Sequence, residues 1–230
     1  MKLGGALAAL LLLSSCNQQP AGPTKHEAVH FDLDKSERVR VELRMGAGEL
    51  RVSGGSPYLA EADFTYNVPA WKPVVNYHAT GAVGDLEISQ PPGGATFAET
   101  KYEWDVRLND SRETDLIAKL GAGQVDMKLG SLPLRNVELN MGAGEVKVDL
   151  RGEPKRSYDV RIHGGVGSAT VYLPKGVGIS ATASGGIGSI DVSGLEERNG
   201  RYVNPEQLHS PVTVRVEVQG GVGEIKLIAE

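Results

Sequence analysis

The chain contains one cysteine, Cys16, among its 230 residues, so it cannot form an internal disulfide. Its stability must therefore come from packing and from hydrogen bonds between strands. Basic residues are outnumbered as well, with 24 Lys and Arg against 29 Asp and Glu and a net charge of -5. An acidic chain without basic clusters argues against nucleic acid as a partner.

The sequence also lacks an apolar run long enough to span a bilayer. Residues 3–13 form an apolar run of 11 after Lys2, whereas a membrane-spanning helix needs about 20. Leu13-Ser14-Ser15-Cys16 follows and resembles the bacterial lipoprotein signal, in which the cysteine becomes the lipidated first residue. We expect a signal at residues 1–16 with lipidation at Cys16, and a tether at 17–27. The alternatives are an ordinary cleaved signal peptide with an incidental cysteine and a cytoplasmic protein with an apolar start.

A lipoprotein signal implies a cell-envelope protein that reaches the membrane through its lipid anchor. Asn17 is not acidic. By resemblance to Gram-negative sorting, nothing here marks retention in the inner membrane, so the outer membrane is expected if the cell is Gram-negative.

Aromatic residues are scarce, with 3 Phe, 7 Tyr and 2 Trp. Most of them lie in residues 53–115, among them Tyr66, Trp71, Tyr77 and Trp104. Exposed rings on a sheet would suit glycan or peptide binding, because they offer stacking faces with a polar group. The other reading is that these rings form the core of a broader N-terminal section. The four named side chains are the candidate binding residues.

Glycine, in contrast, is abundant, and a short glycine corner occurs seven times. Its last glycine stands at positions 48, 84, 123, 144, 167, 188 and 223. The steps are 36, 39, 21, 23, 21 and 35 residues. A period near 21 to 23 with three longer steps predicts a stack of repeated coils.

Each corner is flanked by strict alternation of apolar and polar residues, the period of a half-buried strand. At a corner the backbone needs positive φ or a close approach to the next coil, and glycine meets both demands. We expect successive corners to stack on one another. The predicted structural glycines are Gly46, Gly48, Gly84, Gly121, Gly123, Gly142, Gly144, Gly165, Gly167, Gly186, Gly188, Gly221 and Gly223.

The same sequence offers little chemistry. No corner completes a nucleotide-binding glycine motif, and each leads into a strand rather than a helix. The β-helix calcium repeat fails by one residue, because Ile190 takes the carboxylate position and Asp191 follows it. His26 and His30 have helical spacing but lie where the tether meets the first strand. We expect no enzymatic activity, no cofactor and no metal.

Several segments resemble the toast-rack family of bacterial envelope domains. They are Tyr66-Asn67-Val68-Pro69-Ala70-Trp71-Lys72-Pro73, Leu86-Glu87-Ile88-Ser89-Gln90, Trp104-Asp105-Val106-Arg107-Leu108, the Gly-Ala-Gly corners and Gly200-Arg201-Tyr202-Val203-Asn204. The resemblance covers about residues 28–230. It implies an all-β, right-handed, β-helix-like stack of short coils without known enzymatic activity, related to LiaF-like stress regulators and to adhesin head domains. LiaF-like proteins carry transmembrane helices where this chain has a lipoprotein leader.

These observations divide the fold into an aromatic-rich N-terminal section, residues 28–115, and a repeated section, residues 116–230. The first functional hypothesis is an interaction or sensory module that binds another envelope component, with a role in the envelope-stress response. The alternative is an adhesin-like or structural surface lipoprotein, and a minor third is a glycan-active enzyme with its site in residues 53–115. The open ends of a β stack can pair with other chains, which leaves self-association open.

Overall fold

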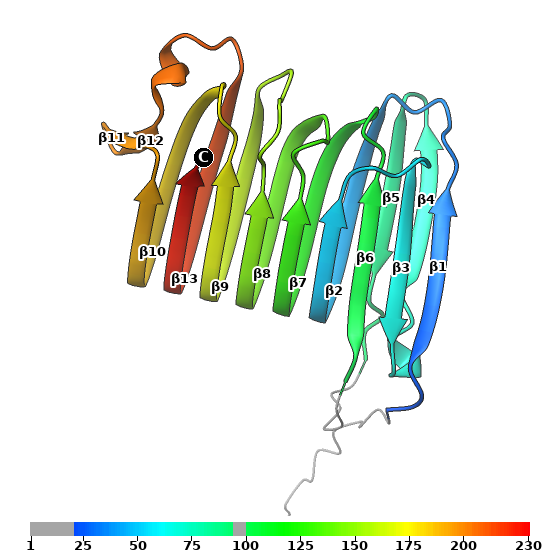
Figure 1. The fold of residues 1–230 in the computed structure, drawn as a ribbon. Coiled ribbons are helices and arrows are strands. Elements are labelled where there is room, and N and C mark those ends of the chain that lie inside the picture. Colours follow the sequence, from blue (N-terminus) through cyan, green and yellow to red (C-terminus); the bar gives the residue numbers. More distant parts are fainter. Residues whose placement is uncertain (1–20, 94–99) are drawn as a thin grey trace, which may run out of the picture.

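The computed structural model describes residues 21–93 and 100–230, and these fold almost entirely into strands (Figure 1). The all-β prediction is therefore confirmed. The elements are β1 (Lys25–Phe31), β2 (Arg38–Ser53), β3 (Ala60–Tyr66), η1 (Pro69–Trp71), β4 (Val74–Thr80), β5 (Val83–Ser89), β6 (Tyr102–Leu108), β7 (Glu113–Lys128), β8 (Leu134–Asp149), β9 (Tyr158–Leu173), β10 (Gly178–Ser193), β11 (Glu196–Arg198), β12 (Arg201–Val203), η2 (Pro205–Leu208) and β13 (Thr213–Ala229). Cys16 lies outside the described residues.

Six long strands form the body of the molecule, and each bends at its centre into a U with two arms (Figure 1). They pair in parallel, in register, in the order β2, β7, β8, β9, β13, β10. Alternate residues of both arms point between the arms, and in β2 these include Val41, Leu43, Leu50 and Val52, each at most 1% exposed. Stacking places such side chains from all six strands in one continuous core.

The order of the stack is not the order of the chain. β13, the last strand in sequence, lies between β9 and β10 and pairs in parallel with both. The corner of residues 219–224 therefore sits between those of 163–167 and 184–188. The expectation that successive corners stack is wrong at this point. The insertion gives β13 two full partners and leaves β10 at the end of the stack.

At the other end of the stack the sheet divides in two. The first arm of β2 pairs with β5, which pairs with β4, and its second arm pairs with β6, which leads to β3 and β1. The expected broader N-terminal section is thus two ladders of seven-residue strands that continue the two arms. The far end carries a smaller cover, because β12 pairs only with Ser180 and Ala181 of β10.

The chain enters the fold at the level of the corners. Lys25 pairs with Tyr66, Tyr66 pairs with Tyr102, and Tyr102 lies one residue before the pair formed by Glu103 and Glu49 of the first corner. Figure 1 shows β1 beginning on the side of the molecule where the U-shaped strands bend. β1 begins at Lys25, inside the tether predicted at residues 17–27, and it begins on the corner side.

Candidate functional site

Two of the four aromatic candidates are core residues. Trp104 is fully buried and Tyr66 is 1% exposed. Phe64 meets Trp104 edge-on with 5.7 Å between the ring centroids. Because neither face of these two rings is open to solvent, Trp104 and Tyr66 cannot form a binding surface, and that interpretation is wrong for them.

The other two candidates are half-buried and held in place. The Tyr77 hydroxyl donates a hydrogen bond to Oδ2 of Asp34 at 2.6 Å. Trp71 lies edge-on to Tyr102 at 5.7 Å between the ring centroids, and the Tyr102 hydroxyl donates to the Trp71 carbonyl at 2.8 Å. Each side chain is fixed against the body of the fold, as expected for packing residues.

The polar groups around the Tyr66 hydroxyl are also paired. The Tyr66 hydroxyl donates to Glu27 at 2.6 Å, and burial together with this carboxylate raises the pKa of Tyr66 to about 12. Lys72 lies 2.6 Å from the same carboxylate, and its ammonium group and the Tyr66 hydroxyl hold the pKa of Glu27 below its usual value. This arrangement fastens β1 to its neighbours and leaves no free acid or base.

Two features of the corners require glycine, the backbone conformation and the close approach of neighbouring strands. In six of the seven corners the second glycine has φ between 129° and 147°, a range that L side chains rarely adopt. A Cβ on either glycine of β8, Gly142 or Gly144, would lie 2.4 Å or 1.9 Å from a carbonyl oxygen of β7. The strands approach so closely at the bend that side chains have no room there.

Gly84 does not share this environment. It lies in β5 opposite Val39, far along the arm from the bend of β2. Gly81 and Ala82 form the two-residue turn between the antiparallel strands β4 and β5, and Gly81 supplies the positive φ of 61°. Six corners, not seven, belong to the stack.

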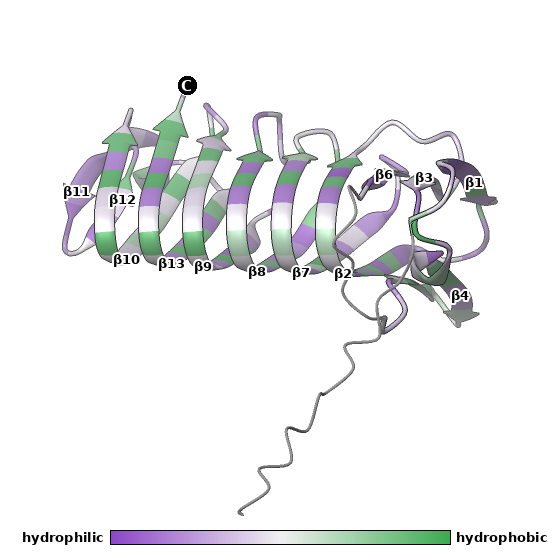
Figure 2. Ribbon diagram, turned by 90° about the horizontal axis from the view of Figure 1, so that it is seen from below, coloured by the Kyte–Doolittle hydropathy of each residue, from purple (hydrophilic) through white to green (hydrophobic). Residues whose placement is uncertain are grey.

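The residue between the two corner glycines points outward and forms a continuous row, which we call the corner ridge. In stack order the corner ridge consists of Ala47, Ala122, Ala143, Val166, Val222 and Ile187. Val166, Val222 and Ile187 are 57%, 46% and 73% exposed. Figure 2 views the bends from below and shows them more hydrophobic on β9, β13 and β10 than on β2, β7 and β8.

The residue before the first corner glycine points inward. Its side chain becomes smaller along the stack, whereas the side chain on the corner ridge becomes larger. In stack order this row is Met45, Leu120, Met141, Gly164, Gly220 and Gly185. The first three side chains are buried at 3–5% exposure. Where the inner position carries a large side chain the ridge carries Ala, and where the inner position is glycine the ridge carries Val or Ile.

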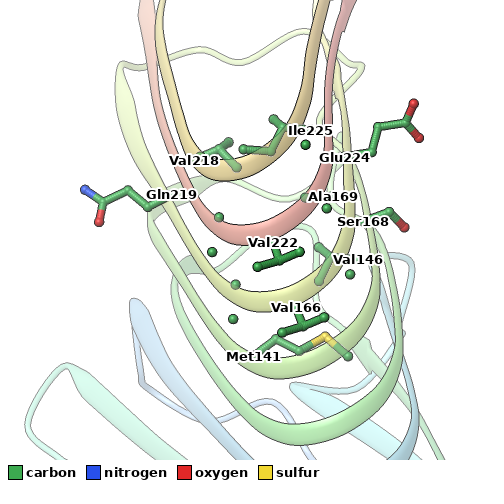
Figure 3. A pocket seen from close by; sticks show the side chains of 18 of the residues that line it. Met141, Val146, Val166, Ser168, Ala169, Val218, Gln219, Val222, Glu224 and Ile225 are labelled. Carbon is green, nitrogen blue, oxygen red and sulfur yellow. The ribbon is translucent and has the colours of Figure 1, made fainter.

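The inner glycines leave a cavity of about 70 Å³ at the bends. Val146, Ile162, Val218 and Ile225 line it together with Met141. Figure 3 shows Val218 and Ile225 between the arms, whereas Val166 and Val222 lie beneath the bends of their strands. The ridge residues Val166, Val222 and Ile187 also line the cavity. Of the polar lining residues, Ser168, Gln219 and Glu224 point away from the space between the arms in Figure 3.

The residues that flank the corner ridge also differ between its alanine half and its aliphatic half. The N-terminal half of the ridge is flanked by Arg44, Lys119, Glu49 and Glu145, whereas His163, Ser168, Gln219, Glu224, Ser184 and Ser189 flank the aliphatic half. Glu224 is itself paired with Lys226 at 2.7 Å. The aliphatic half of the ridge is therefore exposed and has one charged flanking residue, whereas the other half has four, together with the neutral Asn140 and Gln124.

The described residues contain neither a cluster of potential metal ligands nor a helix that could span a membrane. Within residues 21–93 and 100–230, no three His, Cys, Asp or Glu side chains come together as metal ligands. No helix in these residues has the length and hydrophobicity to cross a membrane.

Reasoning from the sequence missed the corner ridge, although the signal was present. The first, third and fourth corners read Met-Gly-Ala-Gly or Leu-Gly-Ala-Gly, whereas the last three read Gly-Gly-Val-Gly or Gly-Gly-Ile-Gly. Comparing the corners position by position would have separated them into two classes.

Comparison with known proteins gives a family and a near full-length structural relative. Residues 20–172 match the family described as the N-terminal domain of toast_rack, DUF2154. A "putative cell adhesion protein" from Clostridium sporogenes superposes with a TM-score of 0.87 at 32% identity, covering 90% of this chain and 100% of the other.

More distant structures include a "putative adhesin" from Bacteroides fragilis, at 11% identity and a TM-score of 0.29, covering 91% of this chain and 99% of that one. That superposition is too poor to compare function. No curated protein matches the chain.

Proposed function

This chain belongs to the toast-rack family, and from that premise we propose that it is a non-catalytic, lipid-anchored cell-envelope protein whose β stack serves as an interaction module. The observation that carries the proposal is the Clostridium sporogenes structure, which matches 90% of this chain and is described as a cell adhesion protein. A rigid stack with a single core suits the presentation of a surface to a partner. No described cluster of polar groups suggests catalysis in its place.

The anchor half of the proposal rests on residues 1–16. The short apolar run and Leu13-Ser14-Ser15-Cys16 fit a lipoprotein signal, and acyl chains at Cys16 would hold the protein at the membrane. The test is to express the chain in its own host with a labelled fatty acid. We expect the wild-type chain to take up label and the Cys16→Ala variant to take up none, and uptake by both would contradict the anchor.

The interaction half is tested separately. Crosslinking in intact envelopes followed by affinity capture should recover an envelope component with the wild-type chain and less of it with Cys16→Ala. An inner-membrane signalling protein among the captured partners would favour a role in the envelope-stress response. Reaction of the chain with antibody on intact cells would favour the adhesin-like alternative, which the Clostridium sporogenes relative supports. Recovery of the same background proteins with both variants would contradict an interaction module.

A further inference from the structure

We infer that the aliphatic half of the corner ridge, Val166, Val222 and Ile187, contacts the lipid bilayer to which the chain is anchored. The inference rests on the lipid anchor of the proposed function and adds an orientation, with the corners toward the membrane. Three apolar side chains that lie next to one another and are 46–73% exposed are unusual on a surface with abundant charge.

The point of chain entry favours the bilayer as the occupant. Lys25 lies at the level of the corners through its pairing with Tyr66 and the pairing of Tyr66 with Tyr102. The backbone N–H of Gly22 donates to the Asn67 carbonyl at 2.7 Å, which holds the chain on that side. Residues 17–24 can reach at most about 29 Å when fully extended. A lipid on Cys16 would therefore keep the corner side near the membrane.

β1, the first strand after the predicted anchor in the sequence, and the aliphatic half of the ridge lie toward opposite ends of the stack. Six strand steps separate β1 from β9 and eight separate β1 from β10, which is about 29 Å and 38 Å at a strand spacing of about 4.8 Å. An anchor at one end alone would leave the molecule free to swing. An apolar contact at the other end would lay the stack along the bilayer surface.

Shape and charge also favour lipid over a second copy of the chain. The ridge is the convex line of the bends (Figure 2). Two convex lines meet over little area, whereas a stable protein interface buries about 1,200–2,000 Å². Soft acyl and headgroup layers can deform around such a line. The flanks of the aliphatic half are mainly Ser, Gln and His, and the chain has a net charge of -5, so the surface suits zwitterionic rather than anionic lipid.

The test places an environment-sensitive fluorophore on the ridge of the full, lipidated chain. With Cys16 acylated, Ile187→Cys provides the only free thiol. Leu208→Cys is the matched control, since Leu208 is an apolar side chain of similar exposure, 66% against 73%, and η2 lies on the side opposite the corners (Figure 1). Each labelled protein is reconstituted into phosphatidylcholine vesicles with or without lipids that carry a spin label on the acyl chain.

We expect emission from position 187 to shift to shorter wavelength and to be quenched by spin-labelled lipid, with neither effect at position 208. Adding Val166→Glu and Val222→Glu to the Ile187→Cys protein should abolish quenching while the protein still floats with the vesicles. Equal emission at both positions in protein that floats would overturn the ridge contact and leave the anchor intact. Protein that does not float would overturn the anchor, and the ridge contact with it. A shift at position 187 without lipid that grows with protein concentration would show that a second copy covers the ridge, and would also overturn the inference.

Discussion

Gly144→Ala should destabilise the stack strongly, because two separate effects act at this position. Gly144 has φ of 134°, and a non-glycine residue held in such a conformation costs about 1–3 kcal/mol. A Cβ there would also lie 1.9 Å from the carbonyl oxygen of Gly123. That overlap is removed only when β8 moves away from β7, at a further cost of about 1–3 kcal/mol. Together the two effects amount to about 2–6 kcal/mol.

Two control glycines separate the backbone effect from the steric one. Gly200 has φ of 73°, and a Cβ added there would have no heavy atom within 4 Å, so Gly200→Ala meets only the left-handed penalty of about 1–2 kcal/mol. Gly164 has neither feature, since its nearest neighbour is the Gln219 carbonyl oxygen at 4.0 Å. Gly164→Ala should be neutral or should stabilise by up to about 1 kcal/mol.

Thermal unfolding followed by circular dichroism measures these differences. For a protein of this size each kcal/mol shifts Tm by roughly 2–4 °C, so a loss of about 4 kcal/mol in Gly144→Ala lowers Tm by roughly 8–16 °C. Gly188→Ala has a similar overlap, with Gly223, at 1.7 Å. Its cost should be smaller, because the bend of β10 has no strand beyond it in the described residues and can move outward. Equal shifts in Gly144→Ala and Gly200→Ala would refute the close approach of the bends as the cause.

Side chains of the N-terminal section should also control stability and its pH dependence. Trp104→Ala removes a fully buried ring and should cost about 3–5 kcal/mol in urea unfolding, whereas Val74→Ala, 44% exposed, should cost little; equal losses would contradict the assignment of Trp104 to the core. Because the pKa of Glu27 is lowered in the folded state, its contribution is complete above its ordinary pKa and is lost as pH falls through the folded value. Stability should therefore decline below roughly pH 4.5, and less steeply in Lys72→Met; an unchanged slope in that variant would argue against the pair. Tyr66, with its pKa raised to about 12, should stay protonated in the folded chain at roughly pH 10.5 and ionise there on unfolding, so ultraviolet absorbance titrations of wild type and Tyr66→Phe should coincide at that pH while both are folded, and a larger tyrosinate signal from folded wild type would contradict it.

The repeated unit could be predicted because its determinants are local. Alternation along each arm and the glycines at each bend specify a strand, a corner and another strand without reference to the rest of the chain. The inward residues of β8, such as Val137 and Leu139, are fully buried as the alternation requires. The repeat period and the family resemblance both predicted the stacked arrangement, and residues 20–172 match that family.

The order of the units could not be predicted, because it depends on which edges meet in three dimensions. β13 reads like the other repeats, and nothing in its own sequence shows that it pairs with β9 on one side and β10 on the other. The same limit applies to Gly84. Its Gly-Ala-Val-Gly context resembles a corner, but β4 folds back on β5 and turns the motif into a hairpin end.

The aromatic residues illustrate a different limit. Sequence alone left Tyr66 and Trp104 divided between core and binding surface, since a ring suits both. The structure decides for the core because β3 and β6 place both residues on the face that packs between the two ladders, where Trp104 contacts Phe64 and Tyr102. Burial is a property of the sheet and its neighbours, and the residue type does not specify it.

The two classes of corner also differ in stability, and the difference bears on function. The pocket of about 70 Å³ at the bends lacks packing contacts that a side chain could make, and β8 shows that Met141 can fill the same inner position. Exposing Val or Ile on the ridge gains nothing for folding in place of Ala. Selection for stability alone would therefore favour the β8 arrangement in every strand. β9, β13 and β10 differ from β8 at both the inner and the ridge position. Two differences that together lower stability are expected where a surface serves binding. The side chains exposed by this change are Val166, Val222 and Ile187, the residues we place against the bilayer.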